Sequence, residues 1–252
     1  PYLLRDDIAM LTGRPQHEIR IIRFEAAGCY GRNCADDVAA DAVLLSRAVG
    51  RPVRVQLTRE QENVWDPKGS GQLMEVAGGL GPDGSLAAYD YQSRYPSNAA
   101  PTLALLLTGR VAPVPDVIQM GDRSARPQYE YENLRVTIHD MAPLVRTGWI
   151  RGVSALPSVF AHESFIDELA AEAKADPLDF RLRHMGDERA AALTRATAER
   201  AGWQHRVGPN PQRDDAEIVR GRGVAQAVLR DEDVPVDARA MSRGWWSARI
   251  PA

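Results

Sequence analysis

The chain has 252 residues, 44% of them hydrophobic and 26% charged, with a formal net charge of -3. This length corresponds to one large domain or two modest ones, and it is sufficient to bury a sizeable core. The composition excludes a disordered, collagen-like or coiled-coil chain, and the near-neutral charge gives no sign of a nucleic-acid partner. No apolar run approaches the ~18–20 residues that cross a membrane.

The two cysteines indicate the redox state of the chain. Cys29 and Cys34 are too few for a disulfide framework, and they lack the second pair of ligands that a structural zinc site needs. We therefore expect free thiols, which makes the cytoplasm the default location. The chain begins at Pro1, with neither an initiator methionine nor a secretory signal pattern, and we expect it to be a piece of a longer protein.

Hydrophobic periodicity, caps and chain breakers predict an α/β fold with mixed sheets. Gly13 and Gly50 are expected to end helices, and Asp36 or Asp37 starts the helix that Gly50 ends. The expected strands cover residues 19–24, 53–58, 72–80, 85–94 and 133–140. The expected helices cover residues 3–12, 36–49, a short turn capped by Thr58, 156–175, a segment opened by Asp176 and Pro177, and 187–202.

One glycine-rich segment, Gly79-x-Gly81-x-x-Gly84, formally matches the dinucleotide-binding fingerprint. That fingerprint requires a helix N-terminus directly after the glycines, because the helix amides bind the pyrophosphate. Here residues 85–91 alternate as a strand, and Asp-Gly between two alternating segments is typical of a hairpin. We therefore predict a β-hairpin and exclude nucleotide binding.

The tripeptide His162-Glu163-Ser164 combines residue types that are common in catalytic sites. It lacks a second histidine at zinc-ligand spacing, and it is not part of a G-x-S-x-G nucleophile elbow. The three residues share one turn of an expected helix and point to different sides. We interpret them as solvated or helix-packing polar residues, and the remaining histidines show no ligand spacing.

Two loops carry the remaining candidate sites. Residues 28–33 lie between an expected strand and a helix N-terminus, where unpaired amides favour an anion or an electron-rich oxygen. Asp36 and Asp37 favour the alternative of a structural turn, because they can cap the same amides. In the segment 146–156, Arg151 lies beside Gly152, where an arginine fork can bind phosphate or carboxylate; the alternative is a solvated side chain.

Taken together and in order, these loops and the following helices resemble one family. The residues that carry the resemblance are Ala27-Gly28-Cys29-Tyr30-Gly31, Gly50-Arg51-Pro52-Val53, Thr58-Arg59-Glu60-Gln61-Glu62, Arg151-Gly152, Phe160 to Ala170 (FAHESFIDELA) and Asp176 to Arg183 (DPLDFRLR). They resemble the molybdopterin-binding large subunit of the molybdenum hydroxylases, the xanthine dehydrogenase and aldehyde oxidase family. The resemblance covers residues 3–225, and the Gly-Cys-Tyr-Gly loop is most similar to the bacterial branch of nicotinate dehydrogenase and isoquinoline 1-oxidoreductase.

The resemblance implies an oxidoreductase that hydroxylates an N-heterocyclic aromatic or oxidises an aldehyde, with water as the oxygen source. It implies a molybdenum–molybdopterin cofactor, with the cytosine dinucleotide form as one option. Electrons would leave through iron–sulfur clusters on a small partner subunit or another domain, and a cytochrome or flavin subunit is a further candidate partner. Relatives that pass electrons to cytochromes make a membrane-associated or periplasmic location the alternative to the cytoplasm.

The resemblance also implies which residues bind the cofactor: Gly28, Cys29, Tyr30, Gly31, Arg151 and Gly152. The backbone of the first loop would face the molybdenum oxo group, with Gly28 keeping the turn open. Arg151 and Gly152 would contact the dithiolene or phosphate region. Cys29 replaces a glycine of the usual loop, so the backbone there has to accommodate a side chain.

Departures from the family pattern limit the expected chemistry. Cys34 lies where some relatives carry a substrate-facing glutamate, and Val153 where some carry an aromatic residue, so purine recognition is not expected. The family's catalytic base is a glutamate in a GxGE segment, which the chain lacks. We therefore expect no catalytic residue, no direct metal ligand and no activity of this fragment alone. The alternative hypothesis is a non-catalytic remnant or interaction module that keeps the fold.

The resemblance implies a first molybdopterin-binding domain over residues 1–185 and the truncated start of a second over 186–252. Residues 226–252 show neither a helical nor a strand period, and we interpret them as disordered or out of frame. Because the second domain is expected to be cut short, an apolar interface would be exposed, and we expect poor solubility of the isolated chain.

Overall fold

A computed structural model of the chain describes residues 2–24, 28, 36–96, 101–113, 117–143, 145–208 and 221–227. The chain divides into two compact units. The first unit comprises Pro1–Leu73, Arg94–Gly121 and His139–Val153, and the second comprises Met74–Ser93, Asp122–Ile138 and Ser154–Ala252. The predicted family domains, 1–185 and 186–252, stay a prediction, and most of the segment 226–252 lies outside the described residues.

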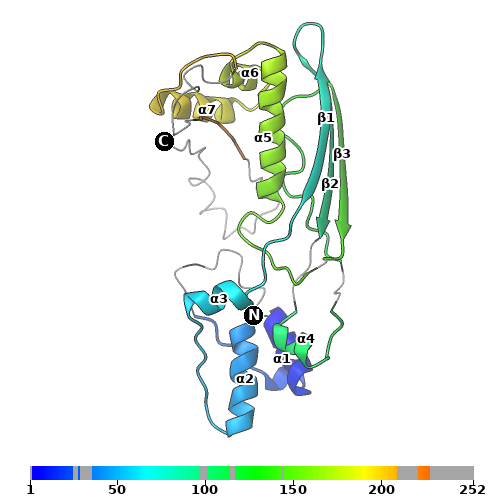
Figure 1. Cartoon of the computed structure of the whole chain (residues 1–252), viewed down its shortest axis with the longest axis vertical. Coiled ribbons are helices and arrows are strands. Elements are labelled where there is room, and N and C mark those ends of the chain that lie inside the picture. Colours follow the sequence, from blue (N-terminus) through cyan, green and yellow to red (C-terminus); the bar gives the residue numbers. More distant parts are fainter. Residues whose placement is uncertain are drawn as a thin grey trace, which may run out of the picture. The chain divides into compact units, whose positions relative to one another are not determined.

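The first unit is a cluster of short helices (Figure 1). Leu11, Ala40 and Leu105 are buried where three of these helices meet. Gly13 and Gly50 adopt left-handed conformations, with φ of 70° and 63°, and end the first two α-helices as predicted. The elements of this unit are α1 (Tyr2–Thr12), the 3-10 helix η1 (Gln16–Glu18), α2 (Asp37–Val49), α3 (Arg59–Trp65) and α4 (Leu103–Leu107).

The short helix α3 is stabilised by a capping box, which confirms the predicted turn after Thr58. The Thr58 Oγ1 atom accepts a hydrogen bond from the Gln61 backbone N–H at 3.3 Å. The Gln61 side-chain oxygen accepts in return from the Thr58 N–H at 2.9 Å. Helix α4 was not among the expected helices, and its N-terminal amides receive their partners from other elements rather than from a local cap.

Two predicted strands are wrong. Residues 19–24 and 53–58 are both described, and neither forms a strand. Val53, Val55 and Leu57 are partly buried and alternate with exposed neighbours, so the two-residue period is present in the side chains. A strand also requires a backbone partner, and neither segment belongs to a ladder among the described residues.

The sheet has three strands in the order β1-β2-β3, and most of it belongs to the second unit. Strand β3 (Asn133–Met141) is parallel to β2 (Leu86–Pro96), as the arrows in Figure 1 show. The hydrogen bond from the Glu132 N–H to the Leu86 carbonyl and the bond from Arg135 to Asp90 advance in the same chain direction. The mixed sheet and its helices confirm the predicted fold class, and the three strands match the three remaining expected strands.

The turn between β1 (Leu73–Leu80) and β2 confirms the hairpin at Gly79-x-Gly81-x-x-Gly84. The Gly81 N–H donates to the Ser85 carbonyl at 2.9 Å. Gly84 has a φ of 78°, which a residue with a side chain rarely adopts. A strand follows the glycines, so the segment lacks the helix N-terminus that a pyrophosphate site requires.

Helix α5 (Ala155–Glu172) lies along the sheet (Figure 1), and α6 (Pro177–Arg183) and α7 (Glu188–Arg200) follow it. Ile166, Phe180 and Ala191 from the three helices share one buried cluster. A Cβ atom at Gly78 of β1 would lie 2.5 Å from the Ala88 carbonyl and 3.0 Å from the Phe165 ring. The absence of a side chain at Gly78 therefore permits the close packing of α5 on the hairpin. These helices confirm the predicted ones to within a few residues.

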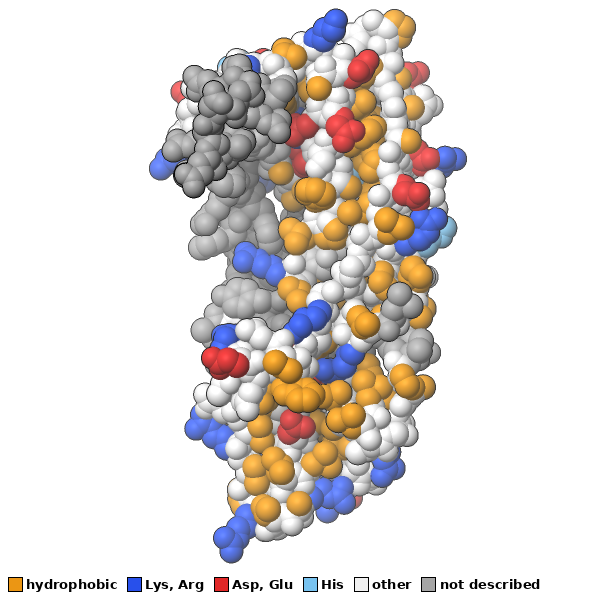
Figure 2. Space-filling model, in the orientation of Figure 1, with side chains coloured by type: hydrophobic (Ala, Val, Ile, Leu, Met, Phe, Trp, Pro, Cys, Tyr) orange, Lys and Arg blue, Asp and Glu red, His pale blue; other side chains and the backbone are white. Residues whose placement is uncertain are grey.

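Apolar side chains remain exposed on each unit. In the first unit they gather over α1, α2 and α4 on the face that Figure 2 shows. Phe24 is 82% exposed and Trp65 56%, while Phe160 of the second unit is 68% exposed. Within the described residues, no helix combines the length and the hydropathy required to cross a membrane.

Candidate functional site

The predicted site residues Arg151, Gly152 and Val153 form one tight turn in the first unit. The Val153 N–H donates to the Ile150 carbonyl at 2.8 Å. Gly152 and Val153 both have left-handed backbones, with φ of 88° and 50°. A β-branched residue avoids this region, and such strain costs of order 1–3 kcal/mol and is typical of functional sites. The strained backbone marks this turn as a candidate site.

The Arg151 guanidinium is available to an anion. Its side chain is exposed, and no described residue accepts a hydrogen bond from it. A guanidinium presents a planar fork of donors that matches phosphate and carboxylate oxygens. The neighbouring Gly152 has no side chain and allows a bound group to approach the backbone. These residues fit the phosphate-bearing cofactor that the sequence resemblance implies.

The other predicted loop, residues 28–33, is only partly described. Gly28 is exposed. The side chain of Asp36 makes no capping bond to α2, and the Asp37 carboxylate is hydrogen-bonded to other partners. Neither aspartate side chain caps the α2 amides. The choice between an anion site and a structural turn at residues 28–33 stays a prediction, because most of this loop lies outside the described residues. The other predicted residues of this loop lie outside the described residues: Cys29, Tyr30, Gly31 and Cys34.

A shielded ion pair joins the start of α2 to the segment that carries Arg151. The Arg146 Nη2 atom lies 2.6 and 2.7 Å from the two carboxylate oxygens of Asp37. The side chains of Arg146 and Asp37 are 15% and 9% exposed. Arg146 is not among the predicted site residues, because its partner lies 109 positions away and no local pattern indicates such a pair.

Two aspartates accept from the first backbone amides of α4. The Thr102 N–H donates to Asp7 at 3.1 Å, and the Leu103 N–H donates to Asp37 at 2.8 Å. Burial raises the pKa of Asp7, the hydrogen bonds with Thr102 lower it, and the charge of Asp37 raises it further. Helices α1, α2 and α4 are thereby joined by polar contacts as well as by their apolar cluster.

In the second unit, His162 is a buried packing residue, one of the two predicted alternatives. Its Nδ1 atom accepts from the Tyr89 hydroxyl, and its Nε2–H donates to the Ser124 carbonyl at 3.0 Å. Burial lowers the pKa of His162 to about 4, although the backbone carbonyl contacts act to raise it. The ring is therefore neutral at pH 7, with both nitrogens hydrogen-bonded inside the fold.

Glu163 is also buried, and it pairs with Arg181 between α5 and α6. The Tyr129 hydroxyl donates to the Glu163 carboxylate at 2.9 Å. The Arg181 Nη1 atom donates to Asp167 at 2.5 Å. Burial raises the pKa of Glu163, and the charge and hydrogen bonds of Arg181 oppose this effect. The motif residues on these two helices therefore form an internal contact of the fold rather than a solvent-facing catalytic group.

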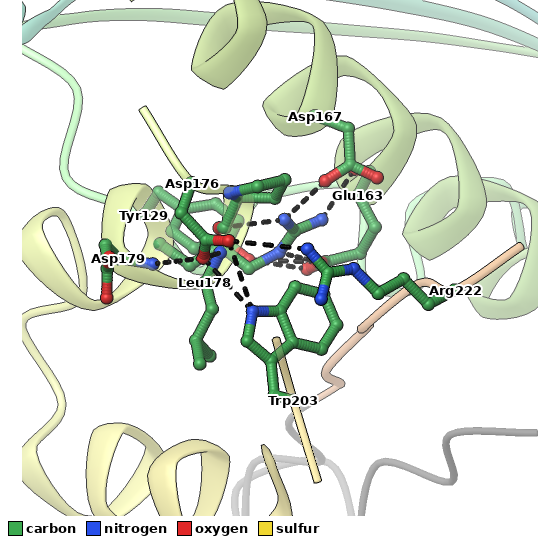
Figure 3. A network of polar contacts seen from close by, with 10 residues as sticks. Tyr129, Glu163, Asp167, Asp176, Leu178, Asp179, Trp203 and Arg222 are labelled. Carbon is green, nitrogen blue, oxygen red and sulfur yellow. Dashed lines mark hydrogen bonds and ion pairs between the residues drawn. The ribbon is translucent and has the colours of Figure 1, made fainter. Parts of the chain in front are cut away.

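Asp176 holds the start of α6 to the chain that follows α7 (Figure 3). Its carboxylate accepts from the Leu178 N–H at 2.9 Å, the Arg206 N–H at 2.8 Å and the Trp203 indole N–H at 3.2 Å. Burial acts to raise the pKa of Asp176, but these hydrogen bonds outweigh it and hold the pKa below its usual value. The Arg222 guanidinium lies over the Trp203 ring, 4.2 Å from its centroid.

Asp176, Asp179 and His205 lie close enough together to be compared with a metal site. The Asp176 oxygens already accept from four N–H groups, those of Leu178, Asp179, Arg206 and the Trp203 indole, and a cation would have to displace these donors. The His205 Nδ1–H donates to the exposed Asp179 carboxylate at 3.0 Å. Asp176 is the N-cap of α6, so its oxygens are already used by the fold, and we assign no metal to this cluster.

The chain is similar to known proteins over most of its length. The family described as the molybdopterin cofactor-binding domain matches residues 1–185. The B subunit of nicotinate dehydrogenase from Pseudomonas putida is 64% identical over 227 residues, which cover 90% of this chain and 19% of that protein. The beta subunit of isoquinoline 1-oxidoreductase from Brevundimonas diminuta is 28% identical over 71% of this chain and 23% of its own length. The chain thus spans about a fifth of the length of these relatives.

A solved structure has a similar fold. Quinoline 2-oxidoreductase from Pseudomonas putida 86 matches with a TM-score of 0.60 at 20% identity, over 80% of this chain and 27% of that chain. At this identity the similarity shows the fold alone. It does not transfer the chemistry of that protein to this chain.

Proposed function

Because the chain belongs to the molybdopterin cofactor-binding domain family, we propose that it forms part of the molybdenum-cofactor-binding subunit of an oxidoreductase. The observation that carries this proposal is the 64% identity to a nicotinate dehydrogenase subunit across 90% of the chain. The role assigned to the chain is to bind and orient the cofactor, and no catalytic base is assigned to its residues.

Arg151 and Gly152 are the described residues that would hold the cofactor. The exposed Arg151 guanidinium would bind an anionic group of the pterin, and Gly152 would let that group reach the backbone. Gly28, also exposed, would contribute backbone from the loop at residues 28–33, and Val153 would face the substrate. When bound, the cofactor supplies the oxidation of an electron-poor carbon with water as the oxygen source.

The proposed substrate class is the N-heterocyclic aromatics, and nicotinate is the first compound to test. The relative with 64% identity is named for nicotinate, and the relative with 28% identity is named for isoquinoline. Aldehydes are the second candidate class, because the sequence resemblance extends to the aldehyde oxidases.

The electron path is part of the same proposal. Both of these relatives are named as subunits, so each works within a larger enzyme. We propose a small iron–sulfur subunit as the partner that accepts electrons, and the cytosine dinucleotide as the form of the pterin. Chemical analysis of the pterin and of the iron and sulfide in the purified complex tests both assignments.

The function is tested on the complete gene product that contains this chain, purified with its bound subunits from a host that makes the cofactor. Nicotinate, isoquinoline and benzaldehyde are supplied separately, with a dye as electron acceptor and water enriched in oxygen-18. We expect dye reduction with a heterocycle and label in its hydroxylated product. Oxidation of the aldehyde alone would select the second class. A molybdenum-loaded protein that oxidises none of them would overturn the proposal and support a non-catalytic remnant.

A further inference from the structure

We propose that Arg146 is a positioning residue for the cofactor, because its ion pair with Asp37 fixes the segment that carries Arg151 to the start of α2. This inference rests on the proposed function. It concerns a side chain that lies apart from the residues assigned to the cofactor, and the hydrogen-bond partners of its guanidinium all lie in the first unit.

Arg146 holds three separate segments with one side chain. Its Nη2 atom contacts the Asp37 carboxylate, its Nε–H donates to the Pro101 carbonyl at 3.2 Å, and its Nη1–H donates to the Trp65 carbonyl at 3.2 Å. Every guanidinium nitrogen is therefore engaged. A lysine carries a single nitrogen on a flexible stem and could not make these three contacts in the same geometry.

The Asp37 carboxylate also accepts several hydrogen bonds. It is the first residue of α2, and its Oδ1 atom accepts from both Arg146 and the Leu103 N–H. The ion pair thus connects α2 and α4 to the segment that begins at Arg146. Because both side chains are largely shielded from water, the pair is little weakened by salt.

Backbone contacts also fix the segment between Arg146 and Arg151. Thr147 forms a parallel bridge with Lys68, and the Gly148 N–H donates to the Lys68 carbonyl at 2.9 Å. The strained turn at Ile150 to Val153 follows directly. Since no described residue accepts a hydrogen bond from the Arg151 side chain, its position depends on this backbone. Loss of the ion pair would therefore shift the guanidinium away from the cofactor.

The test compares Arg146→Gln with Leu105→Ala in the complete gene product. Leu105 is fully buried in the core of the same unit, so its truncation destabilises the unit without touching the ion pair. Molybdenum and pterin are measured per protein chain after dialysis. Hydrogen exchange of residues 149–153 is measured in protein from a host that lacks the cofactor. Asp37→Asn removes the same ion pair by neutralising its acidic partner. Arg146→Lys keeps the positive charge but not the three guanidinium contacts.

We expect Arg146→Gln and Asp37→Asn to retain molybdenum about tenfold more weakly, a size typical of residues that orient a metal site indirectly. Exchange at 149–153 should be faster in both, Arg146→Lys should be intermediate, and Leu105→Ala should match the wild type in both measurements. Equal losses in Arg146→Gln and Leu105→Ala, or unchanged retention in Arg146→Gln, would overturn the positioning role. A wild-type protein without molybdenum would instead overturn the proposed function.

Discussion

Glu163 and Arg181 form a buried ion pair, with 3.0 Å between the Glu163 Oε2 and Arg181 Nε atoms and side-chain exposures of 7% and 1%. The Arg181 Nη2 atom also donates to the Glu163 backbone carbonyl at 2.9 Å. The pair therefore joins both a side chain and the backbone of α5 to α6. The two motif segments, Phe160 to Ala170 and Asp176 to Arg183, are therefore joined to each other inside the fold.

Replacing Arg181 with methionine is expected to destabilise the 252-residue chain by about 3–5 kcal/mol, because the Glu163 carboxylate would stay buried without its counter-charge. Urea unfolding followed by far-UV circular dichroism measures the change. The control is Arg135→Met, which removes an exposed ion pair with Asp90 and should have little effect. A comparable loss of unfolding free energy in the two variants would contradict the claim that burial makes the loss of Arg181 costly.

The neutral, buried His162 makes stability depend on pH. Its pKa is about 4 in the folded chain and ~6.5 in the unfolded chain, so the folded state binds fewer protons between these values. The contribution of neutral His162 to the free energy of unfolding is fully present above pH ~6.5. This contribution is lost as the pH falls toward 4, by about 3 kcal/mol in total. Unfolding of His162→Gln should lack this part of the pH slope, whereas His17→Gln, at an exposed position, should keep it. Identical slopes in all three proteins would refute the assignment.

Val153 and Lys174 offer a matched pair of left-handed residues, with φ of 50° and 52°. Glycine at either position should change the free energy of unfolding by at most about 1 kcal/mol, because relief of strain is offset by the flexibility of glycine. Only Val153→Gly should raise the KM for the heterocycle, by about tenfold, because it removes a proposed substrate contact. Steady-state kinetics on the complete gene product checks this. An unchanged KM in Val153→Gly would remove this residue from the substrate site.

Exposed apolar side chains predict aggregation of the isolated chain. Leu156 and Phe160 are 69% and 68% exposed and lie one turn apart on α5. The double variant Leu156→Ser/Phe160→Ser should raise the soluble yield without loss of helical signal. Glu168→Ser, which replaces an exposed polar residue of the same helix, should not. A wild-type chain that is a soluble monomer with a sharp cooperative melt would contradict the expectation.

The features that could be predicted from the sequence are those that depend on neighbouring residues. The helix cap at Thr58 and the turn at Gly81 to Gly84 involve residues only a few positions apart. Their residue types restrict the backbone directly, so a single sequence is sufficient to locate them.

The features that were missed depend on distant partners. The segments 19–24 and 53–58 have side chains of strand type, but pairing requires a neighbour that periodicity does not supply. The Arg146–Asp37 pair spans 109 positions, and nothing near either residue indicates the other. Likewise, His162 and Glu163 sit on one helix turn, and only the packing of other elements buries both of them. The Arg-Gly pair and the family resemblance both point to Arg151 and Gly152 in the sequence, whereas the left-handed backbone of Val153 is visible only in the structure.

The central claim, that Arg151 helps to hold a molybdenum cofactor, is tested most directly by metal analysis of the complete gene product. Molybdenum per chain is measured before and after dialysis in the wild type, in Arg151→Gln and in Arg110→Gln, which changes an exposed arginine of the same unit. We predict near-stoichiometric molybdenum in the wild type and in Arg110→Gln, with retention in Arg151→Gln weakened by about tenfold. A wild-type protein that contains no molybdenum, or an Arg151→Gln variant that retains it fully, would contradict the claim.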